Sequence, residues 1–137
     1  MSYDSDNIFA KILRGDLPCV RVFENSETLA FMDIMPAAAG HVLVIPKEPA
    51  ETIFDLSEAA TGALATITRK VAIAVRKALD CPGVMLVQLN GSTAGQSVPH
   101  VHFHILPRTQ PDFTFHGRRP VDPKSLEPIA AKIRAAL

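Results

Sequence analysis

Polar and apolar residues alternate strictly in one segment of the chain. Histidine takes every second position there and an apolar residue each position between, in the order His100, Val101, His102, Phe103, His104, Ile105. Successive side chains on a β-strand point to opposite faces of the sheet. The alternation therefore predicts a strand bounded by Pro99 and Pro107, with three imidazoles on one face and an apolar anchor on the other.

Apolar periodicity predicts the remaining elements. Helical spacing indicates helices over residues 5–14, capped by Ser5 or Asp6, over 55–79, capped by Asp55 or Ser57, and from Asp122 to the C-terminus. Alternating or continuous apolar runs indicate strands over residues 20–24, 29–33, 40–46 and 84–89. The expected fold class is α+β: about five mostly antiparallel strands, one long helix on a face and short terminal helices.

The chain is expected to form one domain with two parts. Its 137 residues suffice for one hydrophobic core. Residues 1–108 hold the predicted sheet and form the core of the domain. Residues 109–137 form a C-terminal extension that begins with an irregular, proline-rich stretch. In the final helix, the predicted apolar stripe consists of Leu126, Ile129, Ile133 and Leu137.

Charge and cysteine content exclude several classes of partner. Lys and Arg together equal Asp and Glu, 14 of each, so no electrostatic case exists for nucleic acid polymers or membranes. Neither a signal peptide nor a membrane span is visible. Cys19 and Cys81 are isolated and lack metal-type spacing. A reducing, cytoplasmic setting is the default expectation.

The histidine row favours a nucleophile over a metal site. The Cα atoms of His100 and His104 would lie about 13 Å apart on a strand, whereas zinc holds nitrogens at about 2.1 Å. Two neighbouring histidines could share an ion with help from another strand, but all three are not expected to. Only one imidazole can attack a substrate at a time. His102 is the best placed, because its neighbours can orient it. The alternative is a few polar residues on a solvated sheet face.

A small polar loop precedes the histidine row. Gly91 and Gly95 can adopt positive φ and bring backbone N–H groups together, while Asn90, Gln96 and Ser97 add side-chain donors. Such a loop is a plausible cradle for a phosphate or another oxyanion. An ordinary hairpin connection has a similar composition, so the loop gains weight from the histidines that follow it.

These segments resemble the signature of the histidine triad (HIT) family, in which three histidines alternate with apolar residues. Residues 95–106 carry the signature, and residues 8–12, 29–34 and 40–47 resemble other family blocks in the family's order. The resemblance covers about residues 5–108. The branch most similar to this chain is that of the small nucleoside-phosphoramidate hydrolases and their bacterial relatives.

The resemblance implies roles for individual residues. The implied catalytic residues are His102, His104, His100, His41 and Ser97. The implied substrate-binding residues are Phe9, Ile12, Phe31, Asp33, Ile34, Asn90, Gly95, Gln96, Ser97, Val98 and His104. Among them Asp33 would accept hydrogen bonds from ribose hydroxyls, and His41 would belong to the hydrogen-bond network behind the row. Some relatives bind a structural zinc through cysteines at the positions of Asn7 and Ala10. Both cysteines are absent from this chain, so no metal is expected here.

The resemblance also implies an activity. The expected enzyme hydrolyses purine nucleoside monophosphate derivatives at the α-phosphorus through a nucleotidyl-histidine intermediate, without a cofactor. A dinucleoside polyphosphate hydrolase and a nucleotide-binding regulatory module with slow hydrolysis stay open as alternatives. Family members usually form homodimers, in which C-terminal segments reach toward the partner's pocket. By that analogy Phe113, Phe115 and Arg118 are candidate specificity residues.

Overall fold

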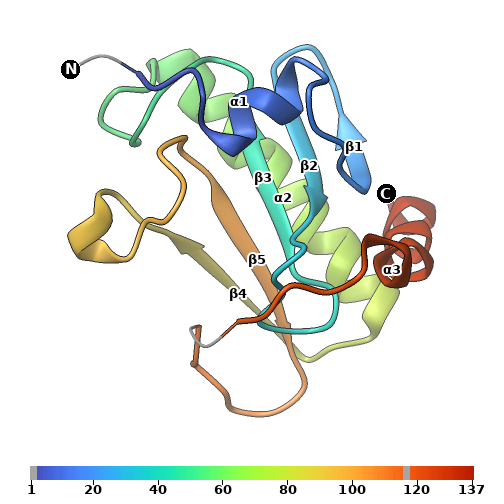
Figure 1. The fold of residues 1–137 in the computed structure, drawn as a ribbon. Helices are drawn as coiled ribbons and strands as arrows, with labels where there is room; N and C mark the ends of the chain where they lie inside the picture. Colours follow the sequence, from blue (N-terminus) through green and yellow to red (C-terminus); the bar gives the residue numbers. More distant parts are fainter. Residues whose placement is uncertain (1–2, 116–117) are drawn as a thin grey trace.

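A five-stranded antiparallel sheet forms the centre of the computed structural model, which describes residues 3–115 and 118–137. The strands are β1 (Arg21–Glu24), β2 (Thr28–Met32), β3 (Val42–Pro46), β4 (Gly83–Gln88) and β5 (Phe103–Arg108). They lie in the order β1-β2-β3-β5-β4. The helices are α1 (Ile8–Leu13), α2 (Glu58–Leu79) and α3 (Pro123–Ala136) (Figure 1). The predicted α+β class is confirmed.

The two faces of the sheet carry different layers. The long helix α2 covers one face, where Val42, Val44, Val101 and Ile105 enter the main core. The short helix α1 crosses the other face, where Phe9 joins a second apolar cluster built from alternate residues of β2 and β3 (Figure 1). The candidate site residues lie on this second face.

The helix ends follow ordinary capping chemistry. Ser57 caps α2 through a bond from the Ala60 N–H, and Asp122 caps α3. The predicted cap of the first helix is wrong: α1 begins at Ile8, because the Asn7 side chain accepts the Ala10 N–H. Ser5 and Asp6 therefore precede the helix.

The histidine strand begins later than the alternation predicts. Strand β5 starts at Phe103, which pairs with Val44 of β3. The ladder stops there because Pro46 has no N–H, and its carbonyl accepts a bond from the His100 ring instead, at 2.8 Å. His100 consequently lies in a bend and His102 on irregular chain just before β5, and only His104 lies within the strand.

The C-terminal extension packs on the same core as the rest of the chain. Leu126, Ala130 and Ile133 of α3 are buried in the main core beside α2 and β1. Leu137 is 42% exposed, so its predicted place in the apolar stripe is wrong. Within residues 3–115 and 118–137, no helix is both long and apolar enough to cross a membrane.

Candidate active site

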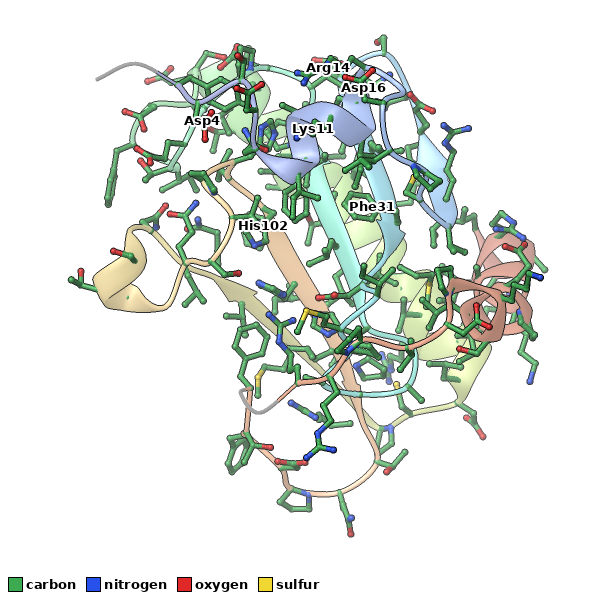
Figure 2. The ribbon with its side chains drawn as sticks, in the orientation of Figure 1. Asp4, Lys11, Arg14, Asp16, Phe31 and His102 are labelled. Atoms are coloured by element: carbon green, nitrogen blue, oxygen red, sulfur yellow. The ribbon has the colours of Figure 1, made fainter. Side chains whose placement is uncertain are left out.

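The side chains of His100, His102 and His104 lie together on the α1 side of the sheet, although only His104 belongs to a strand. All three are buried, with at most 3% of each exposed. The rings of His102 and His104 lie 4.8 Å apart between centroids, and Phe9 of α1 lies 4.9 Å from His102. Figure 2 shows His102 on the same side of the sheet as Phe31. The row therefore lines a compact site beneath α1.

His102 presents one unprotonated ring nitrogen. Its Nδ1 lies 2.7 Å from the main-chain carbonyl oxygen of His100. A carbonyl only accepts, so Nδ1 carries the proton and Nε2 keeps its lone pair. Burial lowers the pKa of His102 to about 4, which keeps the ring neutral near pH 7. The arrangement is that of a nitrogen nucleophile.

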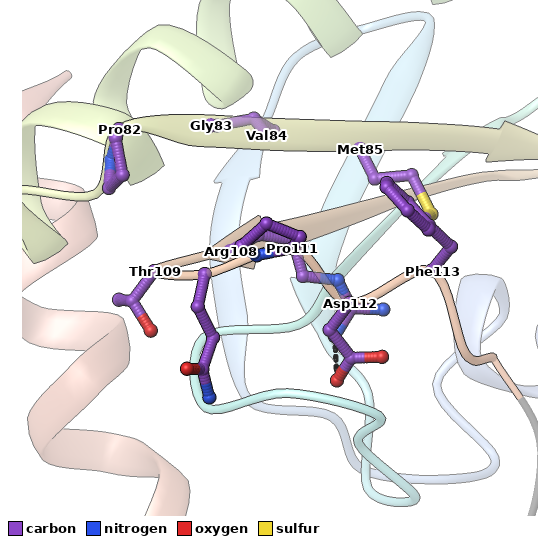
Figure 3. A pocket seen from close by; sticks show the side chains of 10 residues that line it. Pro82, Gly83, Val84, Met85, Arg108, Thr109, Pro111, Asp112 and Phe113 are labelled. Atoms are coloured by element: carbon purple, nitrogen blue, oxygen red, sulfur yellow. Dashed lines mark ion pairs between the residues drawn. The ribbon is translucent and has the colours of Figure 1, made fainter.

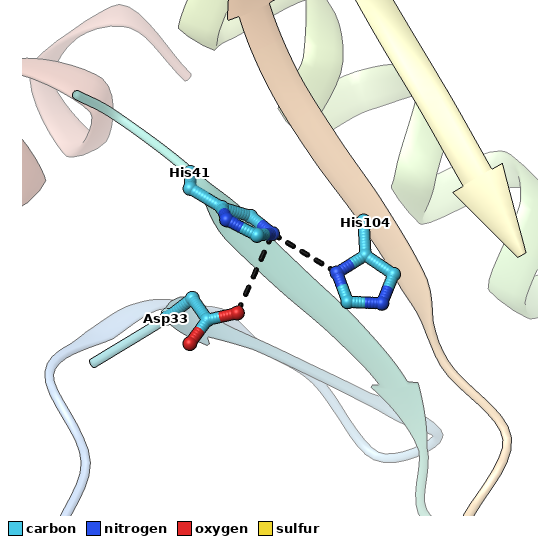
Figure 4. A group of neighbouring side chains, drawn as sticks. All are labelled: Asp33, His41 and His104. Atoms are coloured by element: carbon cyan, nitrogen blue, oxygen red, sulfur yellow. Dashed lines mark hydrogen bonds and ion pairs between the residues drawn. The ribbon is translucent and has the colours of Figure 1, made fainter. Parts of the chain in front are cut away.

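His41 and His104 are joined by a hydrogen bond whose direction follows from their surroundings. The Ala37 N–H donates to His41 Nδ1 at 3.0 Å, so the proton of His41 is on Nε2. That Nε2–H donates to His104 Nδ1 at 2.9 Å (Figure 4). His104 therefore carries its own proton on Nε2. Burial lowers the pKa of His41 to about 3 and of His104 to about 2, so both rings are neutral.

Asp33 lies at the other end of this pair. One carboxylate oxygen accepts the Met35 N–H at 2.8 Å, and the other accepts from Arg118 at 2.7 Å. The second oxygen also lies 3.4 Å from His41 Nε2 (Figure 4). Burial raises the pKa of Asp33, against the opposing effects of Met35 and Arg118. The predicted ribose acceptor is thus a buried carboxylate paired with the C-terminal extension.

Ligand atoms of Asp33, His41 and His104 lie within 4.8 Å of one another, a spacing that could hold a metal ion. The hydrogen bonds argue against that use. A cation at His41 Nε2 would need the tautomer protonated on Nδ1, which would lose the bond from Ala37. It would also face Arg118, which already balances the charge of Asp33. The three residues fit a neutral hydrogen-bond network better than a metal centre.

The polar loop before the row is held by its own side chains. The Gln96 amide oxygen accepts the Gly91 N–H at 2.7 Å, and its nitrogen donates to the carbonyls of Glu51 and Val98. Gly91 and Gly95 have φ of +91° and +99°, as expected of glycines in such a loop. Gln96 is buried, so it shapes the loop from within.

The other two polar residues of this loop differ in availability. The Asn90 carbonyl oxygen accepts the Ile53 N–H at 2.8 Å, and its amide is paired with Gln88. Ser97 is exposed beside the row. Of the three predicted side-chain donors to an oxyanion, only Ser97 is exposed, while Gln96 and Asn90 brace the loop.

Apolar residues predicted to bind the nucleoside lie beside the row. Phe9 and Phe31 are buried and meet edge to face, 5.5 Å apart between centroids. Ile12 and Val98 are partly buried against the same cluster. Ile34 is 49% exposed, two residues beyond the end of β2. Together they give the site an apolar wall.

Two contacts of the site come from residues that the sequence suggested only as candidate specificity residues, by analogy. Phe115 packs edge to face on His104, 4.5 Å between centroids, and Arg118 binds Asp33. Both belong to the proline-rich stretch that analogy would send to a partner subunit; here they lie against their own chain, while Phe113 is 82% exposed. His100 also contacts Tyr3. No periodic pattern in the sequence indicates any of these contacts.

A surface pocket of about 540 Å³ lies elsewhere, between β4 and residues 108–113 (Figure 3). Its lining includes Met85 and the ion pair of Arg108 with Asp112. Neither His41 nor any of His100, His102 and His104 lines it. At the histidine site, Phe9 of α1 packs on His102 and Phe115 of the C-terminal extension packs on His104.

Fold and site together are those of a histidine triad protein. A model of the HIT domain matches residues 14–111, and the chain belongs to the HIT domain family. The adenosine 5'-monophosphoramidase hnt1 of Schizosaccharomyces pombe is 40% identical over 124 residues, 90% of each chain. The adenylylsulfatase HINT3 of Arabidopsis thaliana is 33% identical over 79% of this chain and 55% of its own length.

A solved structure supports the same family at the level of the fold. A Hit-like protein from Bartonella henselae, described as involved in cell-cycle regulation, superimposes with a TM-score of 0.94 at 41% identity over the whole of both chains. The predicted family is therefore confirmed, and the named relatives support a nucleotide hydrolase.

Proposed function

We propose that this protein hydrolyses nucleoside monophosphate derivatives, phosphoramidates above all, at the α-phosphorus through a nucleotidyl-His102 intermediate. The observation that carries the proposal is the bond from His102 Nδ1 to the His100 carbonyl oxygen, which leaves Nε2 unprotonated in a ring that stays neutral. A buried, neutral, oriented imidazole nitrogen is suited to attack an electrophilic phosphorus.

In the first step, His102 Nε2 forms a bond to the α-phosphorus, and the bond from phosphorus to the leaving amine breaks. The Nε2–H of His104 can hydrogen-bond the departing nitrogen, because His41 already donates to the other nitrogen of His104. The His104 ring stays neutral, and the proton that the amine takes up comes from the solvent. Ser97 would stabilise the charge that develops on the phosphoryl oxygens. Water then attacks phosphorus and releases His102, and the proton that this water loses passes to the solvent.

The remaining site residues would hold the nucleotide. Phe9 and Phe31 offer an apolar wall to a purine base. Asp33 would accept ribose hydroxyls, since an ionised carboxylate accepts about four hydrogen bonds and only some are used by Met35 and Arg118. When ribose binds, Arg118 would either move away from Asp33 or share the Asp33 carboxylate with the sugar hydroxyls.

The two named relatives support attack at phosphorus with different leaving groups. One is named for a phosphoramidate and the other for adenylyl sulfate, so their names share an adenylyl group but not the group displaced. A site that attacks the common phosphorus suits both. Dinucleoside polyphosphates carry the same α-phosphorus and are the second candidate substrate. A regulatory module that binds nucleotides and hydrolyses them slowly is the third possibility.

The proposal includes a homodimer in a reducing, cytoplasmic setting. Strand β4 is an edge strand, and Leu86 on it and Ile73 on the adjacent α2 are about half exposed, at 49% and 51%. An exposed apolar edge of this kind favours strand-to-strand pairing between two copies. Cys19 and Cys81 are both free thiols, which suits a reducing compartment. Light scattering of the protein and of Leu86→Lys tests the dimer.

Paired steady-state assays test the activity. An adenosine phosphoramidate should be turned over faster than a diadenosine polyphosphate, and His102→Ala should abolish both reactions while keeping nucleotide binding. Turnover far below about one per minute on both substrates would favour the binding module, because enzymes typically turn over at least about once per second. A fully active His102→Ala variant would remove the proposed nucleophile.

A further inference from the structure

The nucleophile's orientation depends on His100, whose carbonyl oxygen accepts the His102 Nδ1–H. His100 is fully buried, and both nitrogens of its ring are engaged. Its Nε2–H donates to the Pro46 carbonyl at 2.8 Å. Its Nδ1 is therefore an acceptor, and the group in front of it is the hydroxyl of Tyr3.

Tyr3 is itself held in place for this contact. The Asn7 side-chain amide donates to the Tyr3 oxygen at 2.8 Å, which directs the hydroxyl proton toward His100. The ring of Tyr3 also packs edge to face on that of His100, 5.6 Å between centroids. Burial raises the pKa of Tyr3, so the hydroxyl keeps its proton at neutral pH.

We propose that Tyr3 is a positioning residue: its hydroxyl fixes His100, and through the His100 carbonyl it holds His102 in the attacking orientation. The proposal rests on the function proposed above for His102. Tyr3 lies outside the segment that the HIT model matches, residues 14–111, so it is a contribution of this chain's N-terminal residues. It touches no reacting atom and acts only through the backbone of the row.

The test is Tyr3→Phe, which keeps the ring and removes the hydroxyl. A misplaced catalytic group can cost up to about a hundredfold in rate. We expect kcat to fall about tenfold with KM changed less than about threefold, since the nucleotide pocket is untouched. Asn7→Ser keeps a helix-capping oxygen and removes the amide donor, so it should shift kcat in the same direction by a smaller factor.

Arg14→Ala is the matched control. Arg14 also ties down the N-terminal residues, through the Ser5 carbonyl, but it is exposed and contacts no histidine. It should leave kcat within about twofold, because surface substitutions have small effects. An equal loss in Arg14→Ala and Tyr3→Phe would overturn the proposal, since general loosening of the N-terminus would then explain both.

NMR of the imidazole nitrogens separates this proposal from the proposed function, because it needs no turnover. In the unmodified protein His100 Nδ1 should resonate as a hydrogen-bonded acceptor and the His102 Nδ1–H as a strongly hydrogen-bonded proton. Tyr3→Phe should move both signals. If only His100 responds and His102 is unchanged, the coupling is refuted, whatever the enzyme assays show.

Discussion

Removal of the Gln96 side chain tests whether the polar loop is shaped from within. Gln96→Ala deletes three hydrogen bonds, from the Gly91 N–H and to the carbonyls of Glu51 and Val98. The side chain is only 8% exposed. A hydrogen bond contributes about 0.5–1.5 kcal/mol net, and water can reach some of the stranded groups, so the free energy of unfolding should fall by about 2–4 kcal/mol.

Scanning calorimetry measures this loss directly. For a chain of this length one kcal/mol shifts the melting temperature by about 3.5 °C, so Gln96→Ala should melt about 7–14 °C lower. Its kcat should fall as well, because Ser97 would no longer be held beside the row. The matched control is Ser97→Ala: Ser97 is exposed, so its stability should change by less than about 0.5 kcal/mol while its kcat still falls.

The contrast between the two variants decides the role of Gln96. If Gln96→Ala has the same melting temperature as the unmodified protein and only its turnover falls, the amide contacts the substrate directly. The Gln96 side chain would then not be what holds the loop in shape. If Ser97→Ala loses stability without losing rate, the assignment of the two neighbours is reversed.

Four further predictions follow from the site. Because burial lowers the pKa of His102 to about 4, kcat/KM should stay level from pH 8 to about 5 and fall only below that; an acid limb near 6.5 would show an ordinary exposed histidine. The buried imidazoles bind fewer protons folded than unfolded, so the free energy of unfolding should be highest above pH 6.5 and decrease toward pH 4 in a urea titration. A 2′-deoxy substrate should show about tenfold lower kcat/KM than the ribonucleotide, since a buried carboxylate without its partners costs about 1–3 kcal/mol. Asp33→Ala should reduce this preference for the ribonucleotide, and Arg118→Ala should retain it. Equal kcat/KM values for the two substrates in the unmodified protein would exclude Asp33 as the ribose acceptor. Activity should survive exhaustive chelation, because His41 and His104 hydrogen-bond each other; stoichiometric zinc, with activity lost on its removal and regained on its return, would contradict this.

The local patterns of the sequence predicted the fold well. Alternation has a period of two, so the faces of the strands could be assigned residue by residue, and Val101 and Ile105 do enter the main core. The caps of α2 and α3 were also predictable, because capping depends on residues a few positions apart. The start of β5 was not, since it depends on the His100 ring taking the carbonyl of Pro46, which is 54 positions away.

The site was predictable in its residues but not in its contacts. The histidine spacing and the family resemblance indicate which side chains to consider, and the structure brings His41 beside His104. The bonds from Tyr3 to His100 and from Arg118 to Asp33 join residues 97 and 85 positions apart. Single side-chain contacts over such separations leave no periodic trace, so only the folded chain reveals them.

The most direct test of the account is to trap the proposed intermediate. Enzyme mixed with excess adenosine phosphoramidate is quenched in neutral denaturant within one turnover, and the intact protein and its peptides are weighed by mass spectrometry. The account predicts an adduct of one nucleoside monophosphate on His102, absent from His102→Ala. An adduct on His104 or His100, or full turnover by His102→Ala, would contradict it.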